Sequence, residues 1–518
     1  MKKVIIIGAG IAGLTCGIYA CINGFETEIY EQHSLPGGEC TGWDRGQYHF
    51  DGCLHWLVGS KPGTSLNALW RDTGALNDSI AIRPCDAFAR YEEGDAAVTL
   101  YTNADKLKAH LISIAPEDKR AINKLCADIR AMGGMEMPLA KPMDLLTPKD
   151  GLQFLTKDFG AATRSMRYGK MTMAQYVERF KNPFLKRAML ASFSEGYSAM
   201  AFLSTMAGMH AGDCGLPEGG SRALAKRMER RFLALGGRIT YHAKIEQILV
   251  EGGRATGVRL ADGSEAYSDY VVSCADAYAT FMKMLNGRYT PELYKNLFAH
   301  PREYPAITCA LVFMGIDAQL PHPCGKIQVR REAPGIVCGV ETEFTQFVHY
   351  GEDETIAPEG KCVIACFYNA DYDYWNAVYA DRDAYRREKR KLEQDAIHEL
   401  YRRFPEARGK VETTDVVTPM TYERYCGAWR GNWMSWMHPD KAVPSYFPGL
   451  LPDVANFLLA GMWTLPPGGL PGSAAAGRFA AHRLCLMNNL PFYTNENEVP
   501  KEAAPAQDQS ETALPQGE

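Results

Sequence analysis

Three glycines near the start of the chain are spaced for contact with a phosphate group. Gly8, Gly10 and Gly13 give the pattern G-x-G-x-x-G, and the acidic residue Glu31 follows it. The first glycine permits a tight turn, the second lets a pyrophosphate approach, and the third lets a helix pack closely against a strand. The acidic side chain accepts hydrogen bonds from a ribose. We therefore predict a dinucleotide site with the contact residues Gly8, Gly10, Ile11, Ala12, Gly13, Glu31 and Gln32.

The segments around these residues form the unit that such a site requires. Residues 4–7 are a β-branched run typical of a strand buried on both faces, residues 14–23 have helical spacing, and residues 27–30 are a second short strand. Glu31 disfavours NADP, because two like charges about 4 Å apart repel by 1 to 4 kcal/mol. The choice between NAD and FAD stays open at this point.

A further glycine pair favours FAD. Gly37 and Gly38 follow soon after Glu31 and precede the segment HFDGCLHWLVG, residues 49–59. NAD does not need this second pair, whereas a flavin dinucleotide is longer and runs deep between two domains. We predict contacts from Gly37 and Gly38 to FAD.

A second glycine-rich turn lies near the end of the chain. The stretch LPPGGLPGSAAAGRFAAH, residues 465–482, follows a short apolar strand and Gly461, and it opens a helix. The N-terminus of a helix favours negative charge and offers free backbone N–H groups.

These motifs resemble the superfamily of phytoene desaturases, carotenoid isomerases and retinol saturases, from Val4 to about Leu486. The resemblance implies an α/β fold with a Rossmann-type, GR2-like FAD-binding domain and an inserted α+β substrate-binding domain. It places the first loop on the pyrophosphate and the late loop under the flavin. It also implies cofactor contacts from Ile245, Gly461, Gly472, Ser473 and Ala474.

Two departures qualify the resemblance. Many relatives carry an arginine after the glycine pair, but this chain has Glu39, so a phosphate contact from that position is in doubt. The segment 466–476 contains no cysteine, so we expect noncovalent FAD.

The predicted domains are discontinuous. Long insertions rich in methionine and aromatic residues separate the flavin motifs and suggest a large apolar pocket for an apolar small molecule. The tail is rich in Pro, Gln and Glu, so we expect disorder there. The predicted FAD-binding domain comprises residues 1–75, 214–284 and 440–490, the substrate-binding domain residues 76–213 and 285–439, and the disordered tail residues 491–518.

The resemblance implies hydride transfer at flavin N5 that makes or reduces a C=C bond. His55, next to Trp56, is the histidine expected to face the ring, although a packed structural histidine is the alternative. His210 and Asp213 are weaker catalytic candidates, and Tyr197 is weaker still. The electron acceptor or donor stays open, because no second complete dinucleotide motif is present.

The composition limits the partners. The net charge of −5 gives no basic face for nucleic acid. The fifteen cysteines form no CxxC pair and no zinc-type spacing, so we expect reduced thiols, no metal and a cytoplasmic location. The start MKKVIII is not expected to be a signal peptide, because glycines interrupt its apolar run. The basic run at residues 386–391 is a candidate for contact with a membrane surface.

Three functions remain open. The first is an FAD-dependent desaturase or saturase for a polyene, steroid or fatty acid. The second is a redox-neutral C=C isomerase or an amine oxidase on the same scaffold. The third is a non-catalytic escort protein for prenyl or lipid groups.

Overall fold

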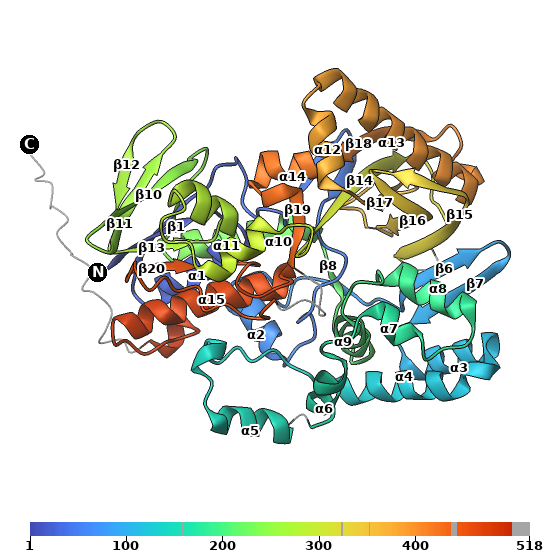
Figure 1. Cartoon of the computed structure of the whole chain (residues 1–518), viewed down its shortest axis with the longest axis horizontal. Helices are drawn as coiled ribbons and strands as arrows, with labels where there is room; N and C mark the ends of the chain where they lie inside the picture. Colours follow the sequence, from blue (N-terminus) through green and yellow to red (C-terminus); the bar gives the residue numbers. More distant parts are fainter. Residues whose placement is uncertain (158, 323–324, 352, 437–442, 500–518) are drawn as a thin grey trace, which may run out of the picture.

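A computed structural model describes residues 1–157, 159–322, 325–351, 353–436 and 443–499. Figure 1 shows two halves side by side, one built on a parallel sheet and the other on a large mixed sheet with a helical layer below it. Among the described helices, none combines the length and the apolar character that crossing a membrane requires.

The first half is built on a parallel sheet of five strands. Its central strand β1 is apolar and β-branched, and residues 4–7 are almost completely buried. Such a strand fits the middle of a sheet covered on both faces. The strand order is β20 (Phe457–Leu459), β13 (Tyr270–Ser273), β1 (Lys3–Ile7), β2 (Glu26–Tyr30) and β9 (Arg238–Thr240).

Three helices pack on this sheet and on one another. Helix α1 makes its largest helix contact with α15 at the other end of the chain, and it also contacts α10. An antiparallel three-stranded sheet extends this half. The helices are α1 (Ile11–Ile22), α10 (Gly220–Ala234) and α15 (Gly469–Met487), and the added strands are β10 (Ile245–Glu251), β11 (Arg254–Leu260) and β12 (Glu265–Tyr267).

The strands of the parallel sheet come from the three segments predicted for the FAD-binding domain. The domain boundaries themselves remain a prediction. Further helices of this half are the π-helix η3 (Ala279–Met284) and α11 (Glu292–Ala299).

The second half is built on an eight-stranded sheet. All its pairings are antiparallel except that between β15 and β6, which is parallel. Figure 1 shows the brown helices above this sheet. The strands are β6 (Ala87–Glu93), β7 (Ala96–Tyr101), β14 (Ala306–Ile316), β15 (Lys326–Val337), β16 (Val340–His349), β17 (Cys362–Asn369), β18 (Val411–Val417) and β19 (Asn432–Trp436), and the helices are α12 (Tyr372–Tyr379), α13 (Arg382–Arg403) and α14 (Pro419–Cys426).

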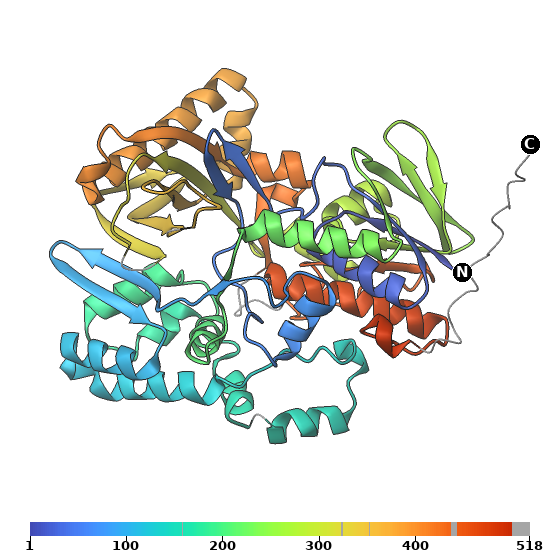
Figure 2. The same cartoon turned by 180° about the vertical axis from the view of Figure 1, so that it is seen from behind.

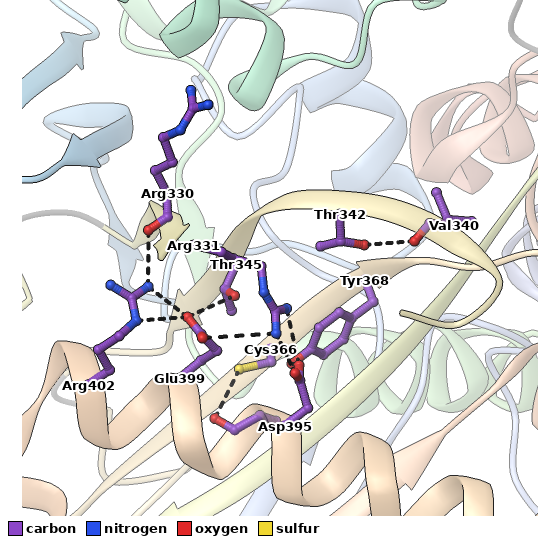
Figure 3. A network of polar contacts seen from close by, with 11 residues as sticks. Arg330, Arg331, Val340, Thr342, Thr345, Cys366, Tyr368, Asp395, Glu399 and Arg402 are labelled. Carbon is purple, nitrogen blue, oxygen red and sulfur yellow. Dashed lines mark hydrogen bonds and ion pairs between the residues drawn. The ribbon is translucent and has the colours of Figure 1, made fainter. Parts of the chain in front are cut away.

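A buried polar network fastens α13 to this sheet (Figure 3). The guanidinium of Arg331 on β15 pairs with Asp395, and the hydroxyl of Tyr368 on β17 donates to the same carboxylate at 2.9 Å. Arg402 donates to Glu399 at 2.6 Å. These charges are paired and hydrogen-bonded, as burial requires.

The helical layer has its own apolar core and packs on the β6–β7 hairpin. The helices are α3 (Ala104–Ile114), α4 (Lys119–Met132), α5 (Pro148–Lys157), α6 (Phe159–Tyr168), α7 (Met173–Val177), α8 (Pro183–Ser192) and α9 (Ala199–His210).

A short hairpin, β3 (Gly42–Arg45) and β4 (Tyr48–Asp51), joins the two halves. Figure 2 shows it as blue strands beside the green helix α10. The ring of Phe50 stacks on Phe313 of β14, with centroids 5.2 Å apart. Near it, helix α2 (Ser65–Asp72) and the paired strands β5 (Ile82–Arg83) and β8 (Leu216–Pro217) complete the junction.

The expectation of disorder from residue 491 is wrong for residues 491–499. Phe492 stacks on His482, with ring centroids 4.5 Å apart, and the backbone N–H of Tyr493 donates to Asn23 at 2.7 Å. This apolar and hydrogen-bonded contact with α1 and α15 orders the segment. Residues 500–518 of the predicted tail lie outside the described residues.

Candidate active site

A cavity of about 1380 Å³ lies between the two halves. This exceeds the ~300–1,000 Å³ of a pocket for one drug-sized ligand, so it offers room for a cofactor and a substrate together. The loops after β1 and β2 line one part of it, and residues of β14–β17 and of α8 and α9 line another.

The first glycine loop opens onto this cavity. Gly8, Gly10, Ile11 and Ala12 line it, and no side chain caps the N-terminus of α1 at Gly10. A Cβ atom placed on Gly10 would meet no atom closer than 3.9 Å, so the space beside it is open. Free N–H groups at an uncapped helix N-terminus fit a pyrophosphate.

Gly13 has a different role from these four residues. It does not line the cavity, and a Cβ atom on it would lie 1.9 Å from the carbonyl oxygen of Gly8. The absence of a side chain therefore lets the helix start directly behind the loop, as the glycine pattern predicts.

Glu31 lies at the end of β2 and is 6% exposed. Its carboxylate accepts hydrogen bonds from the backbone N–H groups of Ala9 at 2.7 Å and His33 at 2.8 Å. A carboxylate has about four acceptor positions, so Glu31 keeps capacity for ribose hydroxyls. Gln32 and Ile245 line the same part of the cavity.

The second glycine pair lies against the first loop. The backbone N–H of Gly37 donates to the carbonyl of Ala9 at 2.8 Å, and Gly10 and Gly37 form a parallel bridge. Gly37 and Gly38 have φ values of 112° and 61°, which glycine adopts without strain. Both line the cavity.

The late loop opens a helix onto the cavity, as the sequence predicts. Helix α15 begins at Gly469, with an uncapped N-terminus at Gly468. Gly461 and Ser473 line the cavity, but Gly472 and Ala474 are buried in the helix and do not. The cofactor contacts that the resemblance implies for Gly472 and Ala474 stay a prediction, because both residues lie within α15 behind the residues that line the cavity.

The cysteine-free late loop, the two uncapped helices and the acidic residue at the end of β2 fit FAD. When bound, FAD supplies two-electron hydride chemistry at its flavin ring. The N-terminus of α1 would hold its pyrophosphate, Glu31 its ribose, and the start of α15 its flavin half.

Two acidic side chains share the cavity with these loops. Burial is the main reason why the pKa of Glu39 lies well above its ordinary value, and the negative charge of the nearby Asp276 raises it further. Burial also raises the pKa of Asp276 to about 6, although its carboxylate accepts backbone hydrogen bonds from Ala279 and Trp429, each at 3.0 Å. Burial therefore favours the uncharged form of the Glu39 carboxyl group, and the sequence had not singled out Asp276.

His55 lines the cavity among aromatic rings. Its ring centroid lies 6.2 Å from Trp56, 6.0 Å from Trp433 and 6.4 Å from Phe367. Within the described part of the chain, the imidazole of His55 makes no hydrogen bond. Burial is the main cause that lowers the pKa of His55 to about 4, and the positive charge of Lys326 lowers it further. The ring is therefore neutral near pH 7.

Lys326 is a cavity residue that the sequence did not single out. It begins β15, its ammonium donates to the carbonyl of Ser192 at 3.1 Å, and it lies 5.0 Å from the ring centroid of Phe88. No motif surrounds Lys326 in the sequence, because the tertiary pairing of β15 with β6 brings it to the cavity.

The other catalytic candidates lie in structural positions. His210 accepts a hydrogen bond from the backbone N–H of Ala104 at 3.3 Å, and Asp213 accepts from Gly59 and Lys61 at 2.9 Å. Neither lines the cavity, so the structure does not support the expected catalytic role of either. Tyr197 does line the cavity, and burial raises its pKa.

Curated relatives include carotenoid enzymes. The chain is 25% identical to the lycopene-forming phytoene desaturase of Pseudescherichia vulneris over 510 residues, which cover 93% of this chain and 98% of the relative. It is 23% identical to the chloroplastic prolycopene isomerase of Daucus carota over 447 residues, covering 81% of this chain and 70% of the relative. The resemblance predicted from the motifs is confirmed.

Solved structures share the fold. An oxidoreductase from Methanosarcina mazei has a TM-score of 0.60 at 16% identity, covering 94% of this chain and 100% of that chain. Cyclohexylamine oxidase from Brevibacterium oxydans has a TM-score of 0.60 at 14% identity, with coverages of 94% and 99%. The predicted α/β fold of the Rossmann type is confirmed.

One family model spans residues 11–485, described as flavin containing amine oxidoreductase. It includes both glycine-rich loops except for the first residues of the N-terminal one. It favours an enzyme over the escort protein that the sequence had left open. The protein is an FAD-dependent oxidoreductase, and its chain belongs to the family of flavin-containing amine oxidoreductases.

Proposed function

We propose that the protein acts on a carbon–carbon bond of an apolar isoprenoid polyene. The observation that carries this proposal is the aromatic wall around His55. Trp56, Phe367 and Trp433 line the cavity, and each contacts the ring of His55. Apolar and aromatic walls with few polar groups fit a hydrocarbon substrate. Two curated relatives are named for phytoene and prolycopene, which are polyenes.

His55 is the proposed proton acceptor. When hydride leaves an allylic carbon, the adjacent C–H group becomes strongly acidic, so a weak base suffices to remove its proton. The neutral imidazole of His55 has a free ring nitrogen for this role, and its low pKa makes it a weak base. The same low pKa makes His55 a poor reservoir of protons for the saturation of a double bond. The chemistry therefore favours desaturation or isomerisation over saturation.

An anaerobic mixing experiment tests the proposal. Yellow holoenzyme is mixed with phytoene, with prolycopene and, as a control, with a primary amine such as cyclohexylamine. Flavin bleaching by phytoene supports desaturation, and conversion of prolycopene without net bleaching supports isomerisation. Bleaching by the amine with no change in either polyene would overturn the proposal.

We also propose that the protein contacts a membrane surface through helix α13. Arg386, Arg387 and Arg390 on α13 are exposed and could face anionic lipid, whereas Lys389 is half-buried and lines the cavity. A cytoplasmic protein that takes an apolar substrate from a membrane is consistent with this arrangement. Sedimentation with anionic and neutral vesicles measures it, and equal binding to both would contradict a role for the basic run.

A further inference from the structure

Cys40 and Cys53 face each other across the base of the β3–β4 hairpin. Gly42 pairs with Asp51, and the backbone N–H of Gly52 donates to the carbonyl of Thr41 at 2.9 Å. Cys40 and Cys53 are the next residues outward from this hydrogen bond, at the points where both segments leave the strands. The backbone N–H of Cys40 donates to the carbonyl of Gly37 at 3.1 Å, and that of Cys53 donates to the carboxylate of Asp51 at 3.0 Å. The two cysteines therefore flank one hydrogen bond that joins their segments.

The two thiols interact with each other. Both are free in the structure. The Cys53 thiol has a pKa well above its ordinary value. The larger cause is a hydrogen bond with Cys40, and the second cause is burial. The Cys40 thiol also lies 3.6 Å from the carbonyl oxygen of Ser221, at the start of α10. The pair is therefore held by two elements, the hairpin and α10.

Both cysteines line the cavity that the cofactor loops line. Cys40 follows Gly37 and Gly38, which lie against the N-terminal loop, and Cys53 comes two residues before His55. The reaction proposed above uses neither cysteine. The segments just before β3 and just after β4 thus bring two sulfur atoms to the lining of one cavity.

We propose that Cys40 and Cys53 are a redox-active pair that exchanges two electrons with FAD. When the pair closes, two S–H bonds break and one S–S bond forms. Two electrons and one proton pass to the oxidised flavin, and the second proton passes to solvent. The reverse transfer opens the disulfide, so the pair would store two electrons beside the flavin. This inference requires FAD, but it does not depend on the identity of the polyene.

The first test asks whether the disulfide forms in the native holoenzyme. The protein is treated with diamide, denatured, alkylated and digested, and the peptides are analysed by mass spectrometry. A peptide that links Cys40 to Cys53 is expected. Cys362 and Cys366 are an internal control, because they lie four residues apart on β17, about 13 Å along the strand, and cannot bridge. The absence of the Cys40–Cys53 link would overturn the proposal.

The second test counts electrons. Oxidised holoenzyme is titrated anaerobically with dithionite while the flavin absorbance and the free thiols are followed. The wild-type protein should take up four electrons per flavin, and Cys53→Ser should take up two, since it cannot close. Cys126→Ser, in the core of the helical layer, should behave as wild type. Equal uptake by the wild type and Cys53→Ser would overturn electron exchange with the flavin. A failed polyene reaction would leave both tests unchanged, so the two proposals fail separately.

Discussion

Gly477 of α15 lies directly against Ala12 of α1. A Cβ atom on Gly477 would lie 2.2 Å from the carbonyl oxygen of Ala12 and 3.0 Å from the backbone nitrogen of Cys16. The close approach sets two uncapped helix N-termini on one cavity, although they begin far apart in the sequence. The two glycine-rich loops are thus parts of one site.

Gly477→Ala should therefore destabilise the protein and weaken its hold on FAD. The added methyl group meets backbone atoms that cannot move alone, and overpacking of this kind costs about 1–3 kcal/mol. Thermal unfolding and the ratio of flavin to protein after gel filtration measure both effects. Gly335→Ala is the matched control, since a Cβ atom there has nothing within 4 Å. Equal melting temperatures for the two variants would contradict the close helix contact.

Gly10→Val should leave the apoprotein folded and abolish FAD retention. The side chain would point into open space in the protein but into the path of the pyrophosphate. Circular dichroism and flavin absorbance separate these outcomes. A yellow Gly10→Val protein with full occupancy would rule out the N-terminal loop as the pyrophosphate site.

His55→Ala should keep its flavin but reduce it slowly with substrate. Loss of a positioned proton acceptor lowers rates by about 10²–10⁴-fold. Single-turnover stopped-flow absorbance measures the step. His210→Ala is the control, because His210 lies outside the cavity and should retain the wild-type rate. An unchanged rate in His55→Ala would remove this residue from the mechanism.

Lys326→Met should move the acid limb of the rate profile to higher pH. The charge of Lys326 lowers the pKa of His55, so its removal raises that pKa from about 4, although burial, the larger cause, keeps it below 6.5. A proton acceptor works only when unprotonated, so activity falls as the pH falls through this pKa. Single-turnover rates from below pH 4 up to pH 8 show the limb, and Lys326→Arg should leave it in place. An identical limb in all three proteins would exclude electrostatic contact between Lys326 and His55.

FAD binding should weaken as the pH rises through about 6. Asp276 titrates there because burial raises its pKa, and above that pH its charge repels the pyrophosphate in the same cavity. A loss of about tenfold in affinity corresponds to 1.4 kcal/mol. Fluorescence titration of apoprotein with FAD at pH 5.5 and 7.5 measures it. Asp276→Asn should remove most of the difference, and an equal pH dependence in that variant would assign the effect to another group.

The proximity of Cys40 to Cys53 at the β3–β4 hairpin and the place of Lys326 in the cavity could not be predicted from the sequence. The spacing of the cysteines gave no CxxC pattern, because their proximity depends on the antiparallel register of β3 and β4. Lys326 begins β15, which pairs with β16 and, through its next residues, with β6 more than two hundred residues earlier in the chain, so tertiary pairing sets its position. The sequence made His210 and Asp213 catalytic candidates because they lie between motifs. In the structure both side chains instead accept hydrogen bonds from backbone N–H groups.

The sequence by itself determined the cofactor and the parallel sheet around it. The geometry of a pyrophosphate requires glycines at fixed spacing, and a buried strand, a helix start and an acidic residue must follow in order, so local pattern carries this information. Only the tertiary structure decided which glycines face the cavity, where helix α15 begins, and which side chains surround His55. Those arrangements depend on contacts between segments far apart in the chain, and no local spacing encodes them.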